Sequence, residues 1–183
     1  MSPDSPGAVT SSLRPVVAGF YPDPSICRVG DDYYLAQSSF EFFPGVPLWH
    51  SRDLVTWDQV GHVITRTSQF EAGSYRPSMG IYAPTLRHHE GRFYLITTAV
   101  EGPDGQLLFT ADRPEGPWSD PVLIPGLDGF DPDIAWTEDG TCLVTFCHIK
   151  DWIPQGIHQA TVNPQTGEVL EEPRLVWPGT GLQ

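Results

Sequence analysis

The feature that most constrains this chain is a short proline motif that occurs three times with a changing first residue. The copies read DPSI at 23–26, APTL at 83–86 and DPDI at 131–134. Their prolines are separated by 60 and then by 48 residues. Spacings of about this size are typical of repeat architectures such as propeller blades, in which each unit contributes a few short strands.

The residues that follow each motif repeat with it. Runs of aromatic and aliphatic residues occur at 33–36, 93–96 and 143–146, bounded by Gly, Asp and Pro. We align Leu35, Leu95 and Leu143, which keep the same two spacings. Such runs predict buried strands. The 19 Pro and 18 Gly would interrupt any long helix, so the sequence predicts an all-β protein with four short strands in each unit.

Three units predict about three blades of a β-propeller. Proline at the start of a strand leaves no ladder hydrogen bond unmade, so we expect Pro24, Pro84 and Pro132 to begin the innermost strands of successive blades. Propellers have roughly four to eight blades. We therefore expect an incomplete propeller, in which residues 15–183 are the N-terminal part of a larger catalytic domain and residues 1–14 are a disordered leader.

Composition excludes several classes of partner. A net charge of −13 disfavours binding to nucleic acid, which requires a basic surface. The sequence has no apolar run near the roughly 20 residues of a membrane-spanning helix, and residues 1–14 lack the apolar region of an export signal. Cys27, Cys142 and Cys147 are too few for a disulfide framework. We therefore expect free thiols, no membrane association and a cytoplasmic location.

No metal site is predicted from the sequence. It contains neither a His-Glu-x-x-His nor a Cys-x-x-Cys motif. His88 and His89 are adjacent, so in a strand their rings would point to opposite faces and could not easily share an ion.

The first residue of the proline motif separates scaffold from chemistry. Asp23 and Asp131 carry a carboxylate where the second copy has Ala83. Equivalent positions of propeller blades converge on the axis, and two facing carboxylates suit acid-base hydrolysis of a glycosidic bond. An aspartate before proline is also a common turn residue. Nearby aromatic residues such as Phe40 and Tyr82 suit either a sugar platform or an ordinary core.

The chain resembles glycoside hydrolase family 43, in its β-xylosidase branch. The segments that carry the resemblance are GFYPDPSI (19–26), SFEFFPGV (39–46), HSRDLVTW (50–57), GIYAP (80–84) and GFD (129–131). This resemblance implies a five-bladed propeller that removes xylose or arabinose units from oligosaccharides with inversion and without a cofactor.

The resemblance also implies roles for single residues. Asp23 matches the general base that deprotonates the attacking water, and Asp131 matches the acid that raises the pKa of the proton donor. Phe40, Tyr82 and Ala83 match positions that contact the sugar. The family usually has Trp where Tyr82 stands, and Asp where Thr85 follows Ala-Pro in this chain.

One part of the family pattern has no counterpart in this chain. The family's general acid is a Glu in a Glu-Gly-Pro-His motif, which the sequence lacks, so no residue here is assigned that role. We therefore expect a chain truncated before the general acid. The alternative is an inactive fragment or a weak sugar-binding module without catalysis.

Overall fold

The structure is a computed structural model that describes residues 15–71 and 73–180. The leader predicted for residues 1–14 lies outside the described residues. Every regular element in the described part of the chain is a β-strand, which confirms the all-β prediction. Accordingly, no helix capable of crossing a membrane is found in these ranges.

The strands form three consecutive four-stranded antiparallel sheets. The first sheet contains β1 (Ser25–Val29), β2 (Asp32–Ala36), β3 (Gly45–Ser51) and β4 (Asp58–Ile64). The second contains β6 (Thr85–His89), β7 (Arg92–Thr97), β9 (Gln106–Ala111) and β10 (Val122–Ile124). The third contains β11 (Gly129–Trp136), β12 (Cys142–Lys150), β13 (Ile153–Val162) and β14 (Val169–Trp177). A small sheet pairs β5 (Gly80–Ile81) with β8 (Ala99–Val100).

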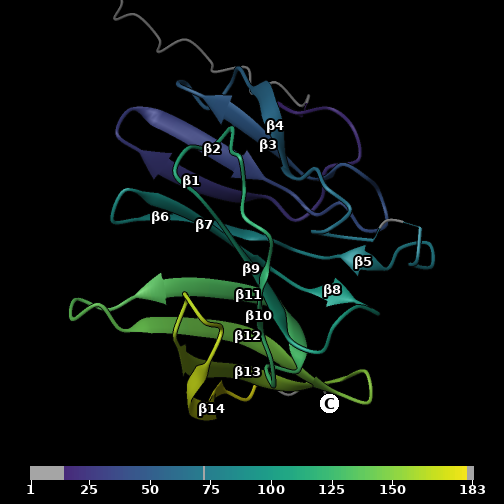
Figure 1. The fold of residues 1–183 in the computed structure, drawn as a ribbon, viewed down its shortest axis with the longest axis vertical. Coiled ribbons are helices and arrows are strands. Elements are labelled where there is room, and N and C mark those ends of the chain that lie inside the picture. Colours follow the sequence, from purple (N-terminus) through teal and green to yellow (C-terminus); the bar gives the residue numbers. More distant parts are fainter. Residues whose placement is uncertain (1–14, 72, 181–183) are drawn as a thin grey trace, which may run out of the picture.

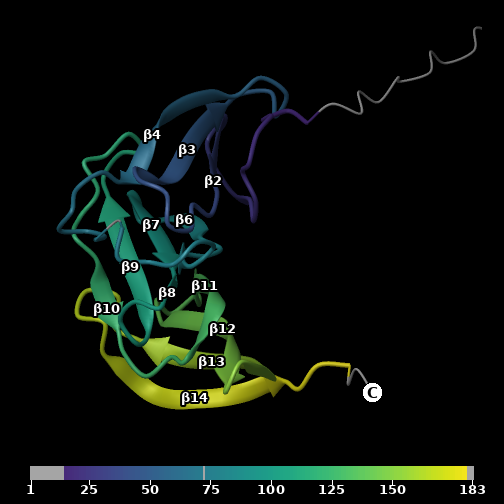
Figure 2. The same ribbon diagram turned by 90° about the vertical axis from the view of Figure 1, so that its right-hand side faces the viewer.

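The three sheets are stacked in chain order (Figure 1), and the side view shows that they follow an open arc (Figure 2). The first strands of the sheets lie side by side, because β1 contacts β6 and β6 contacts β11. Two contacts join these strands: the Leu86 N–H donates to Ser25 Oγ at 3.0 Å, and Arg87 pairs with Asp133 at 2.6 Å. The predicted innermost strands are therefore neighbours.

The prolines mark the starts of two of these strands. Pro24 directly precedes β1 and Pro84 directly precedes β6, as expected. Pro132 instead lies inside β11, where the register with β12 shifts between Phe130 and Asp133. Proline cannot donate a ladder hydrogen bond, so pairing is interrupted there and resumes on both sides as in a β-bulge.

The alignment of the third unit needs a correction of one residue. Leu35 and Leu95 pair with the inner-strand residues Ile26 and Leu86, but the equivalent Ile134 pairs with Val144 rather than with Leu143. Two-residue turns join β1 to β2 and β6 to β7, whereas three residues separate the paired Thr137 and Thr141. The longer turn shifts the strand by one residue, which exchanges its faces. Val144 is accordingly fully buried and Leu143 only partly.

The second sheet is buried on both faces. On β7, Phe93 and Leu95 pack toward the first sheet, while Ile96 packs toward the third. On β9, Leu107 and Phe109 likewise face one way and Leu108 the other. This alternation explains why the apolar run at 93–96 is continuous, since a strand covered on both sides needs apolar residues at every position.

The cysteines agree with the expectation of free thiols. Cys27 and Cys142 are buried, Cys147 is half-buried, and all three are free. A cytoplasmic location stays a prediction.

Leu95 should be a sensitive position for stability. Its side chain is fully buried between the first and second sheets, so Leu95→Ala should lower the free energy of unfolding by about 2–5 kcal/mol. The matched Leu123→Ala removes a side chain that is 38% exposed and should change it by less than about 0.5 kcal/mol. Chemical denaturation of both variants measures the difference, and equal losses would contradict the two-sided core.

Candidate active site

Asp23 and Asp131 share an unusual backbone conformation. Their φ angles are 53° and 56°, in the left-handed region that few residues other than glycine adopt. Ala83, which holds the equivalent place in the second sheet, is not among the described residues with positive φ. Backbone strain of this kind concentrates at functional sites. The two acid-bearing copies therefore differ from the second in backbone as well as in side chain.

A buried serine holds the carboxylate of Asp23. Ser38 lies just after β2 and extends the antiparallel pairing of β1 with β2, since its N–H donates to Pro22 O at 3.2 Å. Its hydroxyl donates a hydrogen bond to Asp23 Oδ2. In the second sheet, Thr98 stands at the position equivalent to Ser38, and its hydroxyl donates to Gln106 instead. The hydroxyl at this position thus bonds to Asp23 in the first sheet and to another side chain in the second sheet, where Ala83 replaces the acid.

The second carboxylate lies within electrostatic range of the first. Partial burial raises the pKa of the Asp131 carboxyl above its ordinary value, and the negative charge of Asp23 raises that pKa further. Cys147 lies opposite Phe130 in the β11–β12 ladder, next to Asp131. Burial and then the charge of Asp131 raise the pKa of its thiol. The structure therefore brings together the two acids that the sequence singled out.

A row of aromatic rings lies along the two acids. The rings of Phe40 and Tyr82 meet edge to face, with centroids 5.5 Å apart. Phe20 extends the row beyond Phe40 at 5.8 Å, and Phe130 extends it beyond Tyr82 at 6.0 Å. Burial raises the pKa of the Tyr82 hydroxyl, and the charges of Glu101 and Asp131 add to this shift.

The sequence analysis predicted the two inner members of this row and missed the two outer ones. A usable signal is present, because Phe20 and Phe130 each follow a glycine just before the acid-bearing motif. Ser38 was also missed. Its signal is the polar run 37–39 directly after a buried strand, since buried polar groups need hydrogen-bond partners.

Close backbone pairing fixes Phe40 beside Tyr82. The Phe40 N–H donates to Ile81 O at 2.8 Å, and the Ile81 N–H donates to Phe40 O at 3.0 Å. A Cβ on Gly80 would lie only 2.5 Å from Phe40 O, and Gly80 has a φ of 95°. Glycine is therefore required for this approach. Ala83 follows Tyr82 and is half-buried, and its predicted contact with sugar stays a prediction.

The segment between β4 and β5 is tied to the same region. Glu41 Oε2 accepts the Ser78 N–H at 3.0 Å, and the Tyr82 hydroxyl donates to Ser78 O at 3.2 Å. Arg76 Nε donates to Glu101 Oε1 at 2.7 Å. These bonds hold the end of the segment against the row of aromatic rings.

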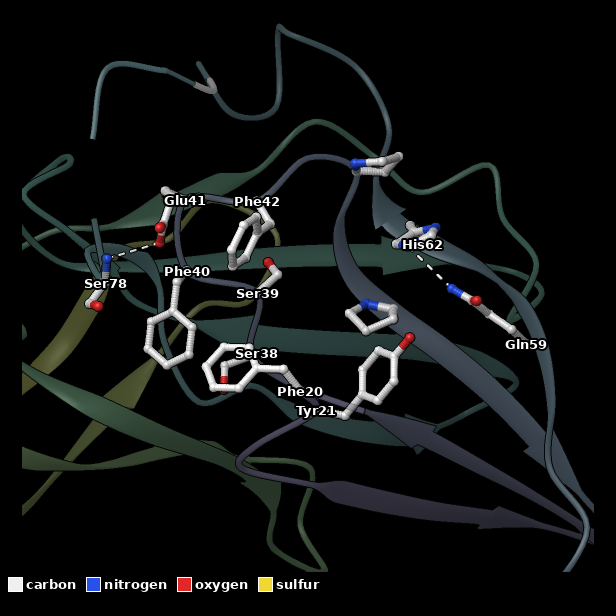
Figure 3. Close-up of a pocket in the computed structure, with 12 residues that line it drawn as sticks. Phe20, Tyr21, Ser38, Ser39, Phe40, Glu41, Phe42, Gln59, His62 and Ser78 are labelled. Carbon is white, nitrogen blue, oxygen red and sulfur yellow. Dashed lines mark hydrogen bonds between the residues drawn. The ribbon is translucent and has the colours of Figure 1, made fainter. Parts of the chain in front are cut away.

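A pocket of about 660 Å³ opens next to Ser38 and Phe40 (Figure 3). Its lining comprises Phe20, Tyr21, Ser38, Ser39, Phe40, Glu41, Phe42, Pro44, Pro47, Gln59, His62 and Ser78. It shares Ser38 and Phe40 with the acid site, but neither Asp23 nor Asp131 lines it. The pocket therefore adjoins the acid pair rather than enclosing it.

The described residues contain no group of three or more His, Cys, Asp or Glu side chains that could hold a metal ion. His88 packs against Phe93 at 4.8 Å, whereas His89 stacks on Trp136 at 4.3 Å. The two rings thus have different neighbours, as their adjacency predicted.

Three consecutive four-stranded antiparallel sheets, with a carboxylate at equivalent positions of the first and the third, have the architecture of β-propeller blades. The sequence profile of glycosyl hydrolases family 43 matches residues 12–183. The chain therefore belongs to this family. The solved relatives are five-bladed β-propellers, and the described residues supply three of the blades.

Individual relatives agree with this assignment. The chain is 41% identical to a xylan 1,3-beta-xylosidase from Vibrio sp, over 94% of this chain and 34% of the relative. It is 43% identical to a non-reducing end alpha-L-arabinofuranosidase from Bacteroides ovatus, over 92% of this chain and 31% of that relative. The crystal structure of xylan beta-1,4-xylosidase from Bacillus halodurans C-125 superposes with a TM-score of 0.83 at 41% identity, covering 92% of this chain and 34% of that one. The chain thus spans about a third of these relatives.

Gly80→Ala should disturb the pairing of Phe40 with Ile81. Gly91 is a matched control, because it also has a positive φ of 79° but open space around its Cα. Gly91→Ala should lower the free energy of unfolding by about 1–2 kcal/mol, because alanine disfavours the left-handed backbone conformation. Gly80→Ala should cost more, because the new methyl group also meets Phe40 O. Chemical denaturation compares the two variants, and equal costs would argue against a steric requirement at Gly80.

Asp131 should make the folded protein less stable as the pH rises. Below the unfolded-state pKa of about 3.9 both states hold its proton. The folded-state pKa is raised, so ionisation is less favourable in the folded state and stability is lost as the pH passes through that pKa. Asp131→Asn should therefore raise the melting temperature relative to wild type at pH 7 but not at pH 3.

A second variant separates the two causes of this shift. Asp23→Asn removes only the smaller cause, because burial contributes more than the Asp23 charge. Most of the pH dependence should therefore persist in Asp23→Asn protein. A stability difference between wild type and Asp131→Asn that is the same at pH 3 and pH 7 would contradict the raised pKa.

Proposed function

We propose that this protein is a glycosidase that hydrolyses xylo- or arabino-oligosaccharides with inversion of configuration. The observation that carries the proposal is the pair of carboxylates, Asp23 and Asp131, which occupy equivalent places in the proline motif, share a left-handed backbone conformation and lie within electrostatic range of each other. Family membership and the printed activities of the relatives support it.

In this proposal, Asp23 is the general base. Its carboxylate takes a proton from the water that attacks the anomeric carbon, while the hydroxyl of Ser38 fixes the orientation of the carboxylate through Oδ2. Inverting enzymes hold base and acid on opposite sides of the bond, which leaves room for the water. Asp131 is a positioning and electrostatic group, whose negative charge would keep a neighbouring proton donor protonated. None of the described residues is assigned the role of general acid.

The row of aromatic rings supplies the sugar platform. Phe40 and Tyr82 are half-buried and meet edge to face, so each leaves part of its surface for a ligand. Ala83 stands where the other copies carry an acid, and its methyl group leaves space for a neutral sugar between the two carboxylates. The substrate in this proposal is therefore a small uncharged oligosaccharide.

A second candidate is a sugar-binding module that does not catalyse hydrolysis. The observation that favours it is the aromatic surface beside the acid pair, which can bind a sugar whether or not hydrolysis follows. In that case Asp23, Asp131, Phe40 and Tyr82 would bind sugar without turnover.

One experiment separates the two candidates. The purified protein is assayed for release of p-nitrophenol from the β-xyloside and the α-L-arabinofuranoside, beside its Asp23→Asn variant. The glycosidase proposal expects turnover that falls by about 10²- to 10⁴-fold in the variant, the range typical of losing general base catalysis. Asparagine keeps the shape of the side chain and tolerates the positive φ.

The control is sugar binding measured calorimetrically on the same samples. Binding of xylose or arabinose without turnover would favour the second candidate. Turnover that survives Asp23→Asn would contradict the role of Asp23, and the absence of both binding and turnover would contradict both candidates.

A further inference from the structure

The pocket beside the acid pair exposes more aromatic surface than a folded protein usually leaves uncovered. Phe20 is 69% exposed and Phe42 is 58% exposed, and both line this pocket. Figure 3 shows their rings in the same region as those of Phe40 and Tyr21. Contiguous exposed apolar surface in a concave site marks a place where a ligand or partner binds.

The aromatic wall is held in place from behind. The ring of Tyr21 meets Trp49 of β3 edge to face at 5.1 Å. The Trp49 indole N–H in turn donates to Gln37 Oε1 at 2.7 Å, and Gln37 is itself buried. Phe20 packs against Phe40. Rigid rings lose little conformational entropy when they bind a ligand, so the wall is preorganised.

Polar groups lie at the two ends of the pocket. In Figure 3, Gln59 and His62 of β4 stand on one side of the rings, and Glu41 with Ser78 stands on the other. Gln59 Nε2 and His62 Nε2 are 3.2 Å apart. Among the described residues, no hydrogen-bond partner is found for Gln59 Oε1 or His62 Nδ1, which leaves one group of each side chain for a ligand.

These end groups favour a neutral ligand. Burial lowers the pKa of His62, which keeps its imidazole uncharged at neutral pH. The Glu41 carboxylate already accepts the Ser78 N–H. Aromatic faces flanked by hydrogen-bonding groups without a positive charge are suited to a sugar, whose C–H faces stack on rings and whose hydroxyls need donors and acceptors.

The pocket adjoins the acid site. Phe40 belongs to both, because its ring lies 5.8 Å from Phe20 in the pocket and 5.5 Å from Tyr82 beside Asp131. Ser38 also belongs to both, because it lines the pocket and donates to Asp23. The pocket and the acid site therefore share a wall, which places the pocket next to any ligand held at the carboxylates.

We propose that this pocket, built by the segment 20–21, the connection 38–44 and β4, binds the sugar units attached to the one held between Asp23 and Asp131. Phe42 and Gln59 would be the residues that make the protein prefer an oligosaccharide over a monosaccharide. This inference rests on the proposed function, since it takes the acid pair as the place of the first sugar.

The test compares trisaccharides with monosaccharides. Isothermal titration calorimetry measures the affinities of xylotriose and arabinotriose, each beside its monosaccharide, for wild type, Phe42→Ala and Gln59→Ala. One aromatic contact is worth about 0.5–1.5 kcal/mol. Phe42→Ala should therefore lower the affinity for the trisaccharide that wild type binds more tightly by about 2- to 10-fold. Gln59→Ala should weaken it in the same direction, and neither variant should change the affinity for the monosaccharide.

Phe43→Ala is the matched control. Phe43 is the next residue and is 41% exposed, but it does not line the pocket, so its loss should leave the trisaccharide affinity unchanged. Circular dichroism checks that all variants are folded. In an amide NMR spectrum, Gln59 and His62 should shift with the trisaccharide and not with the monosaccharide.

The outcomes separate this inference from the proposed function. If Tyr82→Ala lowers the affinity for the trisaccharide but Phe42→Ala and Gln59→Ala do not, the sugar site beside the acid pair is supported and the proposed role of the pocket is wrong. Equal affinities of trisaccharide and monosaccharide for wild type would overturn the pocket as well. If no sugar binds to wild type, the proposed function fails together with this inference.

Discussion

Burial of the second sheet on both faces is the interaction on which the rest of the structure depends. Alternate side chains of β7 and β9 enter two separate cores, one shared with the first sheet and one shared with the third. Because each face is buried, the sheets must stack in order and their inner strands must lie side by side. This packing brings Asp23, just before β1, within electrostatic range of Asp131 in β11, although the two residues are far apart in the chain.

The candidate site lies where equivalent positions of the three units carry different side chains. Ser38, Thr98 and Cys147 occupy equivalent positions beside the first residue of the proline motif. Ser38 binds a carboxylate, Thr98 has no acid beside it and bonds to Gln106, and Cys147 lies next to the carboxyl with the raised pKa. One scaffold thus gives three local environments, because its backbone pairing tolerates different side chains at the strand ends.

Much of this arrangement could be predicted from the sequence. The spacing of the prolines and apolar runs predicted three four-stranded units, and the loss of the acid at Ala83 pointed to Asp23 and Asp131. The pattern misplaced Leu143 by one residue, because turn length was not visible in the alignment of leucines. It also missed Phe20, Phe130 and Ser38, whose roles depend on contacts between segments distant along the chain.

The sequence by itself determined the all-β class, the repeated unit and the identity of the two acids, because alternation of residue types and motif spacing are local properties. The tertiary structure decided which of those residues meet. It set the one-residue shift in β12, joined four rings from four segments into one row, and placed an aromatic pocket beside the acid pair rather than around it. These features arise from the stacking of whole sheets, so no single segment encodes them.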